Sequence, residues 1–248
     1  MSGKEMSFWD HLEELRGTLF RSIIALCVFA VLGFVFKKPL FRIILLPASP
    51  DFFIYRFLNW DFSLEMINVE MAAQFFVHLS AAFGAALIIA FPYLVWEIWR
   101  FVAPALYDNE KKAVRGAFLM ATGFFYLGVA VGYVLVLPAC VQFFMNYSVS
   151  PEVTNAITIG SYMSMFTSTV LLVGVAFEFP TVIWALSRLG LLDRGQLRSG
   201  RRYAIVAVLV LAAIVTPADP LSMVIVAAPL YLLYEISILM CPRKHDID

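Results

Sequence analysis

Long apolar runs separated by charged segments constrain this chain more than any other feature of its sequence. Residues 71–96, for example, contain no Asp, Glu, Lys or Arg. A helix needs about 20 predominantly apolar residues to cross the hydrocarbon core of a bilayer. Since 62% of the 248 residues are hydrophobic and 15% are charged, the sequence predicts an all-α polytopic membrane protein with a single domain, residues 1–248.

Six membrane spans are predicted, at about residues 20–37, 70–100, 113–146, 159–187, 202–216 and 220–240. The sequence TPADP separates the last two spans, because proline disfavours continuation of a helix. The apolar cores of these two spans, residues 203–215 and 221–234, fall about 6–10 Å short of a hydrocarbon core of ~30 Å. The connection 38–69 is expected to be a structured external loop because it contains three prolines, Pro39, Pro47 and Pro50.

The distribution of Lys and Arg predicts the orientation of the spans. An even number of spans places both termini on one side, and that side holds 14 of the 18 cations. Cytoplasmic loops carry the excess of positive charge, so both termini are expected in the cytoplasm. The other side holds only four cations, all in the first loop: Lys37, Lys38, Arg42 and Arg56.

Several classes of function are disfavoured by the composition. The net charge of zero suggests no nucleic-acid partner. Neither the three cysteines nor the three histidines have the spacing of metal ligands, and no nucleotide-binding or catalytic motif is present. We therefore expect no metal, no cofactor and no enzymatic activity.

The first candidate segment is SFWDHLEELRGTL, residues 7–19. Ser7 and Asp10 fit a capping box that starts a helix, and an apolar stripe follows at helical spacing, formed by Phe8, Leu12, Leu15 and Leu19. One interpretation is an interfacial helix leading into the first span. The other is that Glu13 or Glu14 presents a carboxylate at the membrane surface.

The second candidate segment is FVAPALYDNEKK, residues 101–112. Pro104 is expected to end the second span, Asp108 to cap the third, and Glu110 to lie in the first turn of the third helix. Glu110 either binds a cationic ligand or only balances the helix dipole and the neighbouring lysines.

Glu178 is the third candidate, because a carboxylate within a span indicates a functional site. Pro180 removes the donor that would bond the carbonyl of Ala176, so the helix is expected to loosen at this point. Glu178 could instead be a polar anchor for neighbouring hydroxyl groups.

Four motifs in order, HLEELR, FVAPALYDNEK, GVAFEFP and TPADP, resemble the TatC family, the core subunits of the twin-arginine protein translocase. The resemblance covers nearly the whole chain, from Phe8 to Cys241. It implies a concave six-helix bundle in the cytoplasmic (inner) membrane that exports folded proteins with twin-arginine signals, driven by the proton-motive force and without a cofactor. It also implies self-association and single-span partners of the TatA and TatB type.

The resemblance assigns roles to two sets of residues. The residues that it assigns to signal-peptide binding are Leu12, Glu14, Arg16, Phe101, Pro104 and Glu110. The residues that it assigns to docking of partner subunits are Glu178, Thr216, Asp219 and Met223. An arginine side chain is always charged and offers a planar fork of donors, so a carboxylate is its natural partner. The chain departs from the family at Ala213, Ile214 and Met223, where family members often carry polar residues, and Glu13 could substitute partly for Glu14.

Three other functions are alternatives to this one. A proton-coupled secondary transporter could use Glu178 as its proton site, but such proteins usually contain an internal repeat, and none is visible. A membrane enzyme would need a nucleophile–base or metal constellation. A purely structural scaffold is the third alternative.

Overall fold

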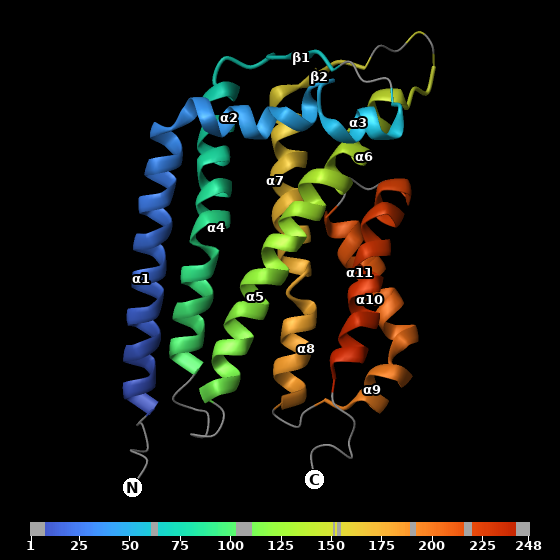
Figure 1. Ribbon diagram of the computed structural model, residues 1–248. Helices are drawn as coiled ribbons and strands as arrows, with labels where there is room; N and C mark the ends of the chain where they lie inside the picture. The colour runs from blue at the N-terminus through green and yellow to red at the C-terminus, as the bar shows by residue number, and fades with distance from the viewer. Residues whose placement is uncertain are drawn as a thin grey trace, which may run out of the picture.

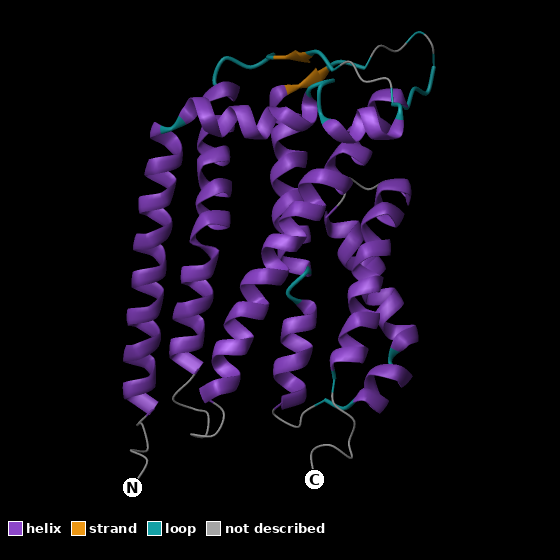
Figure 2. Cartoon of the chain, viewed as in Figure 1, coloured by secondary structure: helices purple, strands orange, loops and turns teal. Residues whose placement is uncertain are grey.

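The computed structural model describes residues 8–60, 64–102, 111–150, 152, 155–188, 192–215 and 220–241. Over these residues the chain is a bundle of long helices, as predicted, with a single pair of very short strands (Figure 2). Four helical segments are long and apolar enough to cross a membrane: His11–Val35, Ala73–Phe101, Phe118–Asn146 and Ile159–Ser187. The prediction of an all-α membrane protein is confirmed.

The spans are built from helices that run alternately up and down the bundle. The first two are α1 (Phe8–Val35) and α4 (Ala73–Val102). The third combines α5 (Lys111–Val131), a π-helical turn η4 (Gly132–Val136) and α6 (Leu137–Asn146). The fourth combines α7 (Ile159–Ala176) with α8 (Phe179–Arg188), and α9 (Arg194–Ser199), α10 (Arg201–Val215) and α11 (Pro220–Met240) complete the chain.

The two ends of the bundle differ (Figure 1). One end, here called the base, holds the start of α1, the end of α4, the start of α5, the end of α8 and the end of α11. The opposite end, the cap end, carries α2 (Lys37–Leu45), η1 (Leu46–Ala48) and α3 (Phe53–Leu58). There β1 (Met66–Ile67) pairs in parallel with β2 (Ile157–Thr158), which joins two connections far apart in sequence.

Tyrosine hydroxyls fasten the cap to the bundle. Tyr133 of η4 donates to the carbonyl of Ile43, and Tyr162 of α7 donates to the carbonyl of Ile44, each at 2.6 Å. The last carbonyls of a helix have no partner within the helix, so these bonds satisfy the C-terminal end of α2. Within the cap, the buried Tyr55 donates to the carbonyl of Pro47 at 2.6 Å, and burial raises the pKa of the Tyr55 phenol.

Small residues bring α5 and α7 into close contact. A Cβ atom on Gly128 would lie 2.6 Å from Cβ of Phe177, and one on Gly174 would lie 2.9 Å from Cγ2 of Val129. Close backbone approach at small residues is a common way to pack helices in membranes, where burial of apolar surface supplies little net drive. This contact fixes the fourth span against the third just before Glu178.

The sixth helix is longer than its predicted apolar core. It continues beyond Tyr234 to Met240, because the intervening polar groups have partners: Glu235 pairs with Arg201 at 2.7 Å, and the Ser237 hydroxyl donates to the carbonyl of Leu233 at 2.7 Å. At about 1.5 Å per residue, its 21 residues span ~32 Å, which suffices to cross a bilayer. α11 thus has the bounds of the predicted span 220–240, its apolar stretch Met223–Leu239 is shorter than the four spans given above, and α10 has 15 residues.

Candidate functional site

The structure brings two of the three candidate segments together at the base. The ring of His11, in the first candidate segment, stacks on the ring of Phe101, near the end of α4, with centroids 4.3 Å apart and planes at 28°. The start of α1 and the end of α4 therefore lie side by side (Figure 1). We call this contact between α1 and α4 the base seam.

A polar stripe on α1, and not the predicted apolar stripe, faces α4. His11 and Glu14 are partly buried and Thr18 is buried, whereas Glu13 and Arg16 are exposed. The spacing of three, four and three residues places His11, Glu14, Thr18 and Arg21 on one face of the helix. Leu12, Leu15 and Leu19 are exposed, as suits the lipid-facing side of a span. The two adjacent glutamates thus have different surroundings, because only Glu14 lies on the face turned to α4.

The base seam contains an ion pair that was not predicted from the sequence. Arg21 on α1 and Glu97 on α4 lie 2.8 Å apart, from Nη2 to Oε2, and Nε of Arg21 donates to the same oxygen at 2.9 Å. The side chain of Glu97 is only 3% exposed, and that of Arg21 is 38% exposed. The hydroxyl of Tyr93 lies close to this carboxylate. The signal for this ion pair in the sequence is Glu97, a lone carboxylate that directly follows the apolar run 71–96.

Four predicted site residues lie outside the described residues: Pro104, Glu110, Thr216 and Asp219. α4 ends at Val102 and α5 begins at Lys111, and both of these helix ends belong to the base. Glu110 directly precedes Lys111 in the sequence.

Glu178 lies at a break in the fourth span. α7 ends at Ala176 and α8 begins at Phe179, so the helix is interrupted where Pro180 predicts it. The amide of Glu178 donates instead to the carbonyl of Val175, three residues earlier, at 3.0 Å. Its Oε1 atom is buried and makes no hydrogen bond with the described residues, although Thr181 and the backbone of Phe125 lie close to the carboxyl group. Such an atom has unused capacity to accept a hydrogen bond.

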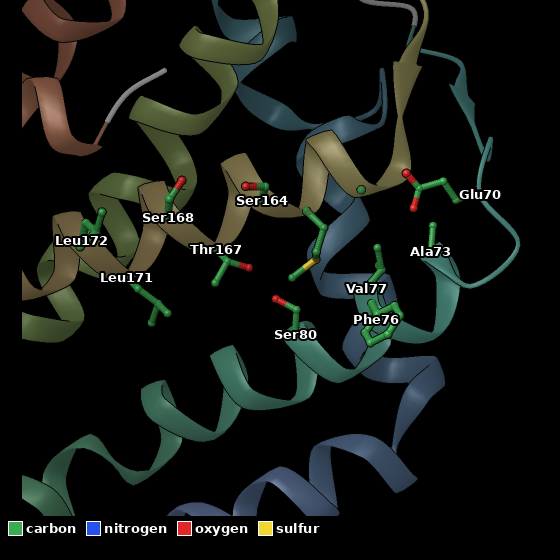
Figure 3. Close-up of a pocket in the computed structure, with 12 residues that line it drawn as sticks. Glu70, Ala73, Phe76, Val77, Ser80, Ser164, Thr167, Ser168, Leu171 and Leu172 are labelled. Carbon is green, nitrogen blue, oxygen red and sulfur yellow. The ribbon is translucent and has the colours of Figure 1, made fainter. Parts of the chain in front are cut away.

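A cavity of about 530 Å³ opens between α4 and α7 in the half of the bundle nearer the cap (Figure 3). Four hydroxyl side chains line it, Ser80, Ser164, Thr167 and Ser168, and Glu70 lies at its cap end. Oγ1 of Thr167 is buried and has no hydrogen-bond partner among the described residues. This cavity was not predicted from the sequence, although small residues recur every fourth position at Gly160, Ser164 and Ser168.

The face of α7 that lines the cavity continues to the last turn before the break at Glu178. Ser164, Ser168, Leu171 and Val175 follow each other at spacings of four, three and four residues, the spacing of one helix face. Val175 is exposed, so this face of α7 stays open between the cavity and the break.

Met223, another predicted docking residue, belongs to the first turn of α11 and packs against a buried cluster that includes Val136, Val208 and Val226. The same cluster contains Phe177, which directly precedes Glu178 in the sequence.

Comparison with known proteins gives a consistent match over nearly the whole chain. The family described as Sec-independent protein translocase protein (TatC) matches residues 10–229. The TatC protein of Deinococcus radiodurans is 36% identical over 94% of this chain and 84% of its own length. The TatC protein of Blattabacterium is 33% identical over 94% of both chains.

Two solved structures have the same fold. Both are crystal structures of a protein described as the twin-arginine translocase receptor TatC, one of them in DDM. Each is 33% identical to this chain, with TM-scores of 0.77 and 0.80. The first alignment covers 93% of this chain and 97% of that one, and the second covers 94% and 99%.

Proposed function

Because this chain belongs to the TatC family of Sec-independent protein translocase proteins, we propose that it is the receptor for twin-arginine signal peptides and the membrane core of the translocase. It would export folded proteins across the cytoplasmic membrane, with the proton-motive force as the source of energy. The observation that carries this proposal is the base seam, which places the HLEELR segment against the end of α4.

The base seam offers the chemistry that an arginine pair needs. Glu14 faces the seam and is partly buried, so its carboxylate is less screened than that of an exposed residue. Glu110 precedes the first residue of α5, where the helix dipole favours an ionised carboxylate. Two carboxylates could each pair with one guanidinium. Leu12, Arg16, Phe101 and Pro104 complete the proposed peptide site.

Orientation follows from charge. We place the base in the cytoplasm because the predicted loops on that side carry 14 of the 18 cations. Precursors would then meet the base seam from the side on which they are made, and the cap would lie on the outer side of the membrane.

Partner subunits are proposed to dock along the open face of the fourth span. A single-span helix of the TatA or TatB type would place small residues against Ser164 and Ser168 and a hydrogen-bond donor at Glu178. Helices associate in membranes through close packing at small residues and through hydrogen bonds between polar side chains. Thr216 and Asp219 remain proposed contacts, as does self-association. The packing of Met223 in a buried cluster makes it the weakest of the four docking residues.

One observation favours a second function, proton-coupled transport. The unpartnered Oε1 of Glu178 is the kind of atom that a proton relay uses. This alternative does not explain why the HLEELR segment is placed against the end of α4. The receptor function is therefore the better supported of the two.

Photocrosslinking tests the receptor function. A photoreactive amino acid is placed at Leu12 in one variant and at Phe57, on the exposed surface of α3, in a control variant. A peptide with paired arginines should crosslink at residue 12 and not at residue 57, and a peptide with paired lysines should crosslink at neither. Equal crosslinking of both peptides at residue 12 would contradict recognition of arginine.

A further inference from the structure

The ion pair between Arg21 and Glu97 has no part in the peptide site proposed above, yet it lies directly beside it. Glu97 is four residues, about one turn, before Phe101 on α4. Arg21 is seven residues, about two turns, after Glu14 on the same face of α1. The pair thus links the two helices that carry the peptide site, within two turns of Glu14 and one turn of Phe101.

The local sequence shapes the position of the guanidinium group. Nη2 of Arg21 donates to the Thr18 hydroxyl at 3.2 Å. A Cβ atom on Gly17 would lie 3.2 Å from Nη1, so the absence of a side chain at residue 17 leaves room for the group to fold back along α1. This direction points from Arg21 toward Glu14, whose negative charge attracts the guanidinium.

An ion pair with one buried partner, here Glu97, is better suited to fixing geometry than to adding stability. Removing two charges from water costs much of what their attraction returns, whereas leaving one of them unpaired is strongly unfavourable. Glu97 is nearly inaccessible, so it tolerates few alternative alignments of α1 against α4. A slip of one helical turn would separate the two side chains by about 5.4 Å and leave the carboxylate unpaired.

We propose that the Arg21–Glu97 pair is a positioning clamp for the twin-arginine site, which sets the height of Glu14 on α1 relative to Phe101 on α4. The clamp acts through Glu14 and does not itself contact the signal peptide. This inference rests on the proposed receptor function and adds to it the residues that make the receptor selective for arginine over lysine.

The test measures selectivity, because a ratio of two affinities does not depend on the fraction of folded protein. Purified protein in nanodiscs is titrated with a twin-arginine signal peptide and with the same peptide carrying two lysines. The variants are Glu97→Gln, which removes the charge of Glu97, and Arg21→Lys, which keeps the positive charge but loses the planar fork of hydrogen-bond donors of the guanidinium group. The matched control is Glu235→Gln, which removes an Arg–Glu pair of similar length, Arg201–Glu235, between α10 and α11.

We expect the preference for the arginine peptide to fall about threefold to tenfold in Glu97→Gln, because a binding site must be held to within about 0.5 Å to keep its best hydrogen bonds. Arg21→Lys should lose part of the preference, and Glu235→Gln should keep all of it. Should Glu97→Gln not yield folded protein, Arg21→Lys and Tyr93→Phe carry the same test.

Three outcomes have distinct meanings. Loss of selectivity in the Arg21 and Glu97 variants but not in Glu235→Gln supports the clamp. Unchanged selectivity in folded Glu97→Gln overturns the clamp, while the receptor function stands as long as Glu14→Gln still loses binding. If the unmodified protein does not prefer the arginine peptide, the receptor function itself fails.

Discussion

Removing the hydroxyl of Tyr162 should loosen the cap far more than removing that of Tyr133, although the two bonds have equal lengths of 2.6 Å. The reason is the carbonyl that each leaves behind. Ile44 is 3% exposed, so its carbonyl would stay buried without a partner after Tyr162→Phe. The amide of Leu46 still donates to the carbonyl of Ile43 after Tyr133→Phe, and Ile43 is 59% exposed, so water can replace the lost donor.

The magnitudes follow from this difference in burial. An unsatisfied buried acceptor costs about 1–3 kcal/mol, whereas a bond that water replaces contributes about 0.5–1.5 kcal/mol at most. Phe fills the space of the Tyr ring, so no large cavity adds to either figure. For a protein of this size, each kcal/mol lowers the melting temperature by about 2–4 °C.

Thermal unfolding in nanodiscs and limited proteolysis of the cap measure the effect. Tyr162→Phe should lower the melting temperature more than Tyr133→Phe and should speed cleavage between α2 and α3. Equal shifts in the two variants, or a larger shift in Tyr133→Phe, would refute the view that burial of the carbonyl decides the cost.

Three further predictions concern other parts of the molecule. If Glu178 docks partners through hydrogen bonds, Glu178→Gln should keep most transport and Glu178→Ala should lose much of it. Equal loss of transport in both variants, with the complex still assembled, would favour a proton relay. α10 spans only about 22 Å and exposes Val206, Val210 and Ile214, so it can thin the bilayer beside it. Inserting four apolar residues into α10 should relieve this thinning and reduce transport without changing peptide binding. Normal transport by the lengthened protein would contradict a role for the short span. Burial raises the pKa of the Tyr55 phenol, so the contribution of Tyr55 to cap stability is complete below the ordinary phenol pKa of about 10 and is lost as pH rises above it. Proteolysis of the cap should therefore accelerate at alkaline pH, and this acceleration should be smaller in Tyr55→Phe.

The sequence was most informative where a local rule decides the structure. The long apolar runs predict the all-α membrane fold, and Pro180 predicts the break before α8, because each depends on the chemistry of neighbouring residues alone. The bounds of α11 match the predicted span 220–240, but the pairing that holds Glu235 in this helix, with Arg201, 34 residues away, was not predictable from the sequence.

Contacts between spans were not predictable in the same way. Arg21 and Glu97 are 76 residues apart, and their pairing depends on the rotation and height of α1 against α4, which no single-sequence pattern specifies. The sequence predicts the apolar stripe of the HLEELR segment, but it does not say whether the stripe faces lipid or another helix, because both environments accept apolar side chains. Only the structure shows that this stripe faces outward and that Glu14, not Glu13, lies on the seam.

The affinity of the base seam for paired arginines tests the central claim most directly. A twin-arginine signal peptide is titrated against the unmodified protein, Glu14→Gln and the neighbouring control Glu13→Gln in nanodiscs. A charge-assisted hydrogen bond contributes about 1.5–3 kcal/mol, so Glu14→Gln should weaken binding about tenfold or more, and Glu13→Gln should change it less than about twofold. Equal effects of the two substitutions, or none from Glu14→Gln, would contradict the account.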